Sequence, residues 1–98
     1  MNNLSRYPIG TVISLKDGVK KIMITGYFPV TVDNDKIIFD YSGCMYPEGF
    51  MSNDKILMFD HNQIEKIYHI GFCDQECIEF HKQINTLILN GGYGNKKQ

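Results

Sequence analysis

Short hydrophobic runs follow one another over residues 11–72, and their spacing predicts β-strands. In one run, Ile37, Phe39 and Tyr41 alternate with polar residues and so share one face of a strand. Asp17-Gly18 supplies the positive-φ residues of a tight hairpin turn, which makes the first two strands antiparallel. The predicted strands are Thr11–Leu15, Lys20–Phe28, Lys36–Tyr41, Lys55–Phe59 and Lys66–Phe72.

The pattern changes to helical spacing after Asp74, which is a plausible N-cap. Asn90-Gly91-Gly92 is expected to end this helix, and Asp60 or Asn62 is expected to cap a separate, single helical turn. The apolar stripe of the long helix consists of Cys77, Phe80, Ile84, Leu87 and Ile88.

Strands first and a helix last predict an α+β fold. We expect a roughly five-stranded antiparallel sheet that can curl toward a half-barrel, with the C-terminal helix packed on one face. The helix stripe is expected to cover Ile22, Ile24, Ile56, Met58 or their opposite-face neighbours. We expect the 98 residues to form a single domain, with an ordered core over about 7–91 and a frayed tail at 92–98.

Composition narrows the functional classes. With 43% hydrophobic and 21% charged residues, the chain is expected to fold. A net charge of −1 without a basic cluster disfavours nucleic acid as the partner. Residues Met1–Pro8 lack the basic-then-apolar order of a signal peptide, and no apolar run has membrane-spanning length. The protein is therefore expected to be cytoplasmic. Cys44, Cys73 and Cys77 are then expected to be free thiols.

Candidate chemistry among these side chains is weak. Cys73, Cys77 and His81 lie at i, i+4 and i+8, a line of roughly 12 Å along a helix that is too long for three ligands of one metal ion. Cys44 with His61 or His69 lacks a third group that would orient a nucleophile. We therefore expect no enzyme activity, metal or cofactor.

The most unusual segment is 40–50, where apolar residues interrupt a stretch with loop composition. Aromatic and methionine side chains are typical of protein interfaces, and proline and glycine hold a turn in shape. In the alternative interpretation the loop folds back to cap one end of the sheet, as we expect for Tyr41 and Met45. The candidate protein-binding residues are Tyr41, Met45, Tyr46, Pro47, Glu48, Gly49 and Phe50.

Four segments of the chain together resemble one protein family: Tyr7–Val12, Lys20–Gly26, Phe39–Gly49 and Phe59–Ile64. It is a domain-of-unknown-function family of small proteins from Gram-positive bacteria, encoded beside type VII secretion toxins of the LXG class. The resemblance covers roughly residues 7–80. Its most specific part is the pattern Asp-Tyr-x-Gly-x-x-Tyr-Pro-Glu-Gly at 40–49.

The resemblance implies a cytoplasmic accessory, a chaperone-like or targeting factor, that binds an LXG toxin for secretion. One alternative is an immunity protein that binds and neutralises a toxin. A second is a small-barrel module for single-stranded nucleic acid, which would stack bases on Tyr46 and Phe50 beside Lys20 and Lys21. A homodimer is also compatible with an exposed sheet edge.

Overall fold

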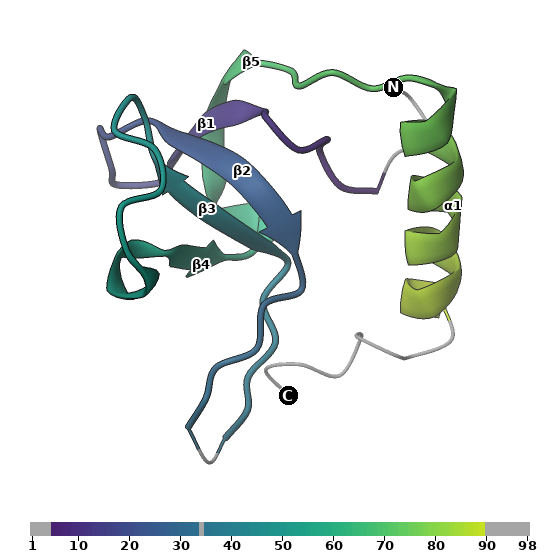
Figure 1. Cartoon of the computed structure of the whole chain (residues 1–98), viewed down its shortest axis with the longest axis horizontal. Coiled ribbons are helices and arrows are strands. Elements are labelled where there is room, and N and C mark those ends of the chain that lie inside the picture. Colours follow the sequence, from purple (N-terminus) through teal and green to yellow (C-terminus); the bar gives the residue numbers. More distant parts are fainter. Residues whose placement is uncertain (1–4, 34, 90–98) are drawn as a thin grey trace.

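The computed structural model describes residues 5–33 and 35–89, and the α+β prediction is confirmed (Figure 1). The predicted helix stop at Asn90-Gly92 and the predicted tail lie outside the described residues. In chain order the elements are β1 (Val12–Leu15), β2 (Ile22–Tyr27), β3 (Tyr41–Met45), the 3-10 turn η1 (Asn53–Lys55), β4 (Leu57–Phe59), the 3-10 turn η2 (His61–Gln63), β5 (Ile64–His69) and α1 (Gln75–Leu89).

The five strands form one antiparallel sheet in the order β4-β3-β2-β1-β5. β4 and β5 follow each other in the chain but form opposite edges of the sheet, and only Asp60 and η2 separate them. The sheet must therefore curl strongly, although its two edges are not paired. η2 is the predicted helical turn, and the Asp60 backbone N–H donates to Gln63 Oε1 at its start, 2.7 Å away.

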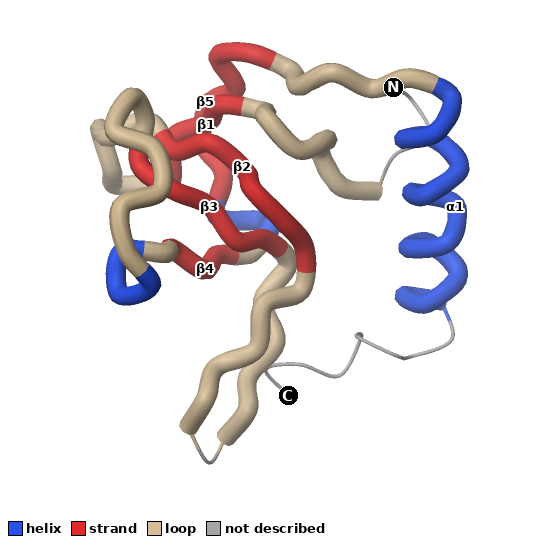
Figure 2. Tube along the Cα trace, in the orientation of Figure 1, coloured by secondary structure: helices blue, strands red, loops and turns tan. Residues whose placement is uncertain are grey.

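The core lies inside this curl. Its buried members come from four strands: Ile13, Ile22, Ile24, Tyr41 and Phe59. The curled sheet itself therefore buries Ile22 and Ile24, while Ile56 and Met58 are each 39% exposed. The expectation that the helix stripe covers these residues was wrong, because α1 packs beside the end of β2 (Figures 1 and 2).

The third strand was predicted too early in the sequence. Residues 28–33 and 35–40 form an irregular arm that extends the β2–β3 pair away from the sheet (Figure 2), with a bridge between Val30 and Ile38. The Phe28 N–H donates to the Asp40 carbonyl at 3.2 Å, but Phe28 and Lys36 adopt positive φ, which interrupts regular pairing. β3 instead occupies Tyr41–Met45, so that it begins at the last residue of the predicted strand and continues through residues 42–45, which the composition had assigned to a loop.

Both edges of the sheet carry features that discourage strand addition. β4 has only three residues, and β5 contains two irregularities in its pairing with β1, next to Ile67 and Ile64. A partner is therefore expected to contact side chains more readily than a sheet edge. No helix among the described residues combines the length and apolar character that crossing a membrane requires.

Candidate functional site

The predicted binding segment divides at Met45. Tyr41 is fully buried in the core, as the alternative interpretation expected, whereas Met45, Tyr46 and Phe50 are exposed. Phe50 and the neighbouring Met51 are 64% and 62% exposed, respectively. We call the exposed apolar group of Met45, Tyr46, Phe50 and Met51 the loop surface.

Backbone and ionic contacts hold this loop in place. The Gly49 N–H donates to the Met45 carbonyl at 2.8 Å, and Gly49 adopts a φ of 80°, which favours glycine. The Tyr46 N–H donates to the Lys21 carbonyl at 2.9 Å, while the Tyr46–Pro47 peptide is cis. The Lys20 ammonium lies 2.8 Å from a Glu48 carboxylate oxygen, and its hydrogen bond lowers the pKa of Glu48. The contacts of Glu48 and Gly49 thus hold the loop, and Tyr46, Pro47 and Phe50 are exposed on it.

A small cavity of about 260 Å³ adjoins the loop surface. It is lined by Val12, Lys21, Tyr46, Tyr68 and His69. The Lys21 ammonium lies 4.9 Å from the centre of the Tyr68 ring, within the range of a cation–π contact. The apolar surface at Tyr46 therefore continues onto β1 and β5 and includes one cation.

The first half of the 40–49 segment has a structural role. Asp40 accepts from Arg6 Nη2 at 2.8 Å and from the His61 backbone N–H at 2.7 Å. The Tyr41 hydroxyl accepts from the Tyr7 N–H at 3.0 Å and lies 2.6 Å from His61 Nδ1. Burial raises the pKa of Tyr41, and burial, together with the Arg6 charge, lowers the pKa of His61. These contacts tie the N-terminal segment to β3 and η2.

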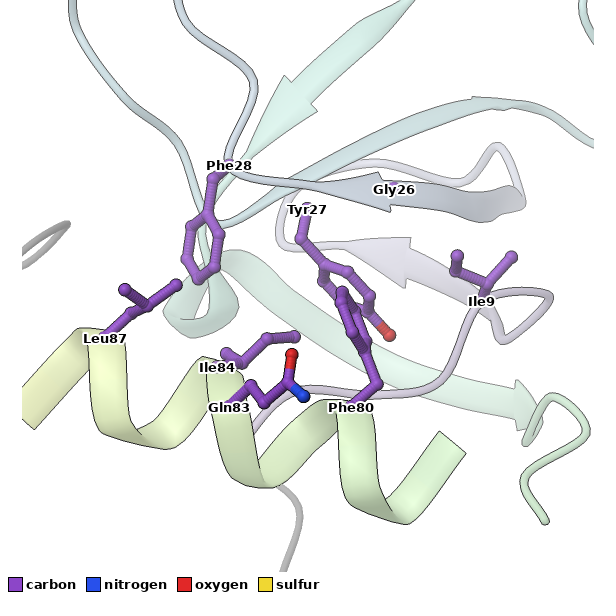
Figure 3. Close-up of a pocket in the computed structure, with 8 residues that line it drawn as sticks. All are labelled: Ile9, Gly26, Tyr27, Phe28, Phe80, Gln83, Ile84 and Leu87. Atoms are coloured by element: carbon purple, nitrogen blue, oxygen red, sulfur yellow. The ribbon is translucent and has the colours of Figure 1, made fainter. Parts of the chain in front are cut away.

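A second apolar surface lies along α1, a feature that the sequence analysis did not predict. We call this cavity of about 400 Å³ the helix groove (Figure 3). Phe80, Ile84 and Leu87 point from α1 toward the end of β2 (Figure 3). Its full lining is Ile9, Gly26, Tyr27, Phe28, Phe80, Gln83, Ile84 and Leu87. Phe80 remains 48% exposed even though it faces the groove.

A polar contact between His81 and Tyr27 joins α1 to the sheet at this groove. His81 is 1% exposed, and its Nε2 lies 3.1 Å from the Tyr27 hydroxyl. That hydroxyl also donates to the Tyr7 carbonyl at 2.6 Å. Burial raises the pKa of Tyr27 to about 12, so the hydroxyl keeps its proton at neutral pH.

Comparison with known protein families identifies one that matches this chain. The model of a domain of unknown function, DUF4176, matches residues 7–80. The chain belongs to the DUF4176 family. No curated protein and no solved structure matches it. The match includes the whole sheet and the loop surface but ends at Phe80, so Ile84 and Leu87 of the helix groove lie beyond it.

The cysteines of this DUF4176 protein correct one prediction. Cys73 and Cys77 form a disulfide, with their Cα atoms 5.2 Å apart, and so are not free thiols. Cys73 precedes α1 while Cys77 lies in its first turn, which brings the two sulfurs together. Cys44 is free and buried in β3. Within residues 5–33 and 35–89, no cluster of three or more His, Cys, Asp or Glu could hold a metal ion.

Proposed function

We propose that this DUF4176 protein is a non-catalytic, cytoplasmic accessory that binds an LXG-class toxin for type VII secretion and contacts it through the loop surface. The toxin class and the compartment come from the family resemblance. The observation that carries the binding role is the exposure of Tyr46, Phe50 and Met51 on a loop whose backbone is held in place. Rigid aromatic side chains lose little entropy on binding and are common anchors of interfaces.

The loop carries an acidic residue that weighs against a nucleic-acid partner. Glu48 pairs with Lys20, one of the two lysines that a nucleic-acid interface at Tyr46 and Phe50 would use. Nucleic-acid affinity depends on neutralising several phosphates, and here part of the positive charge is already neutralised. A protein surface needs no such excess of positive charge.

Co-expression with the toxin from the neighbouring gene tests this proposal. We expect a stoichiometric complex in size-exclusion chromatography with light scattering. Tyr46→Ala and Phe50→Ala should each raise the Kd by about 30-fold, as the loss of an interface anchor does. Both side chains are exposed, so circular dichroism should show an unchanged fold.

Phe72→Ala is the matched control, because Phe72 is an exposed phenylalanine, 81% accessible, outside the loop surface. It should leave the Kd unchanged. If Phe72→Ala weakened the complex while Tyr46→Ala and Phe50→Ala did not, the loop surface would not be the contact. Elution of the protein apart from folded toxin would reject the proposed partner, and neutralisation of the toxin in cells would indicate an immunity protein instead.

A further inference from the structure

The disulfide joins two parts of the chain that meet at the start of α1. The irregular segment 70–74 connects β5 to α1 (Figure 2). Cys73 belongs to this segment, and Cys77 lies in the first turn of the helix. Asp74 Oδ1 accepts from the Cys77 backbone N–H at 3.1 Å and so caps the same turn. Both cysteines are partly exposed, so a small molecule in solution can reach them.

His81 lies one helical turn beyond Cys77, and its ring faces that cysteine. The distance from His81 Nδ1 to Cys77 Sγ is 3.6 Å, and the Cys77 carbonyl oxygen is 3.0 Å from the same nitrogen. On the other side of the ring, the Tyr27 hydroxyl gives its single proton to the Tyr7 carbonyl. His81 Nε2 must therefore donate to Tyr27, and in a neutral ring Nδ1 is left without a proton.

This arrangement matches the reduced cysteine better than the disulfide. A disulfide sulfur and a carbonyl oxygen both lack a proton, so neither can donate to Nδ1. The thiol of a reduced Cys77 can transfer its proton to Nδ1. The His81 imidazolium then donates from Nδ1 to the Cys77 carbonyl and from Nε2 to the Tyr27 hydroxyl. The Cys77 thiolate is left beside this imidazolium, in the first turn of a helix.

We propose that Cys73 and Cys77 form a reversible dithiol–disulfide site that exchanges with low-molecular-weight thiols and disulfides. Cys77 is its reactive thiolate and His81 its proton acceptor. This site goes beyond the proposed toxin binding and does not depend on it. It lies outside the loop surface and requires no toxin for its chemistry.

Reduction proceeds in two balanced steps. The thiolate of a small thiol attacks Cys73 Sγ, the bond between the two protein sulfurs breaks, and its electron pair leaves on Cys77 as a thiolate. A second small thiolate then attacks the mixed disulfide on Cys73. This releases the small disulfide. Of the two protons that the small thiols give up, one goes through solvent to the Cys73 thiolate and the other to His81 Nδ1 beside the Cys77 thiolate. Two small thiols are oxidised and the protein disulfide is reduced. Oxidation is the reverse: the Cys73 thiolate attacks the small disulfide, and the Cys77 thiolate then attacks Cys73 Sγ, closes the protein disulfide and releases the second small thiolate.

Alkylation rates of the full chain at pH 7 test the assignment of Cys77. An ordinary cysteine is only about 3% thiolate at pH 7, whereas a thiolate paired with histidine is mostly ionised. In the Cys73→Ser variant, Cys77 should react with iodoacetamide at least tenfold faster than Cys73 does in the Cys77→Ser variant. The advantage should persist at pH 6. Equal rates, or a rate for Cys77 that falls tenfold from pH 7 to pH 6, would overturn the proposal.

Equilibration with glutathione tests reversibility. Over a series of reduced-to-oxidised glutathione ratios, mass spectrometry after alkylation should show Cys73 and Cys77 gaining or losing two alkyl groups together. Buried Cys44 should stay unmodified and serve as the internal control. A pair that stays wholly reduced or wholly oxidised over the whole series would overturn the proposal. His81→Asn should lower the rate at which Cys77 is alkylated. If His81→Asn does not fold, Tyr27→Phe, which keeps the ring packing, should lower the same rate in its place.

Discussion

The packing of Gly43 in the middle of β3 leads to a prediction about stability. A Cβ atom at this position would lie 2.8 Å from Ile22 Cγ2, 2.9 Å from the Met23 carbonyl oxygen and 3.1 Å from Phe59 Cε1. The Met23 oxygen belongs to the adjacent strand β2, and Phe59 is 1% exposed, so neither can easily move away. Gly43→Ala should therefore destabilise the core of the curled sheet.

The expected size follows from two opposing effects. Overpacking a core costs about 1–3 kcal/mol. Alanine also restricts the unfolded chain, which returns about 0.4–1 kcal/mol. We expect Gly43→Ala to lower the free energy of unfolding by about 1–2 kcal/mol, and Tm by roughly 4–8 °C for each kcal/mol in a domain of this size.

Urea unfolding monitored by circular dichroism measures the change, with Gly18→Ala as the matched control. At Gly18 the nearest atom to an added Cβ is the Leu15 carbonyl oxygen at 3.4 Å, an ordinary contact, and φ is not positive. Gly18→Ala should thus be neutral or slightly stabilising. If Gly43→Ala were as stable as Gly18→Ala, β2 and β3 could separate without cost, and the packing argument would fail.

Two further predictions concern the contacts between the N-terminal segment, β3 and η2. The pKa of His61 is lowered from 6.5 in the folded state. As pH decreases, His61 therefore takes up a proton in the unfolded chain before it does so in the folded protein. The free energy of unfolding should then fall as pH decreases below about 6.5. Urea midpoints from pH 7.5 to 5.5 check this, and His61→Asn should reduce the slope. Asp40→Asn should cost about 3 kcal/mol, because it leaves the Arg6 charge, only 15% exposed, without its ion pair. Glu48→Gln, which breaks an exposed pair, should leave the urea midpoint unchanged, and equal losses for the two variants would contradict this reasoning.

The spacing of hydrophobic residues was sufficient to predict most of the sheet and the helix, but the position predicted for β3 was wrong. Ile37 and Phe39 alternate as strand residues do, yet they belong to the arm, where positive φ at Phe28 and Lys36 disturbs the pairing. In the following segment Gly43 was interpreted as a loop residue. Its true role depends on Ile22 and Phe59, which approach it from other strands, and such contacts between distant segments cannot be derived from local composition.

The helix groove was not predicted, because His81 was considered only as a candidate metal ligand with Cys73 and Cys77 and not as part of the buried stripe. The positions Cys77, His81 and Ile84 have the same helical spacing as the predicted stripe, and the structure buries His81 and Ile84 while Phe80 and Leu87 stay partly exposed. The helical spacing of these positions therefore already indicated that His81 lies on the buried side of the helix. What the sequence did not reveal was that Tyr27 accepts a hydrogen bond from the buried ring.

The loop surface and the helix groove differ in how firmly they are fixed, and this difference separates two ways of binding a partner. Tyr46 and Phe50 project from a loop anchored to Lys20 and Lys21 at the start of β2, and none of these contacts involves α1. The groove exists only while α1 stays beside Tyr27, and the contact that holds it there involves His81, next to the Cys73–Cys77 pair. A partner bound by the loop surface should therefore have the same affinity for the reduced and the oxidised protein. A partner bound in the groove should distinguish the two states.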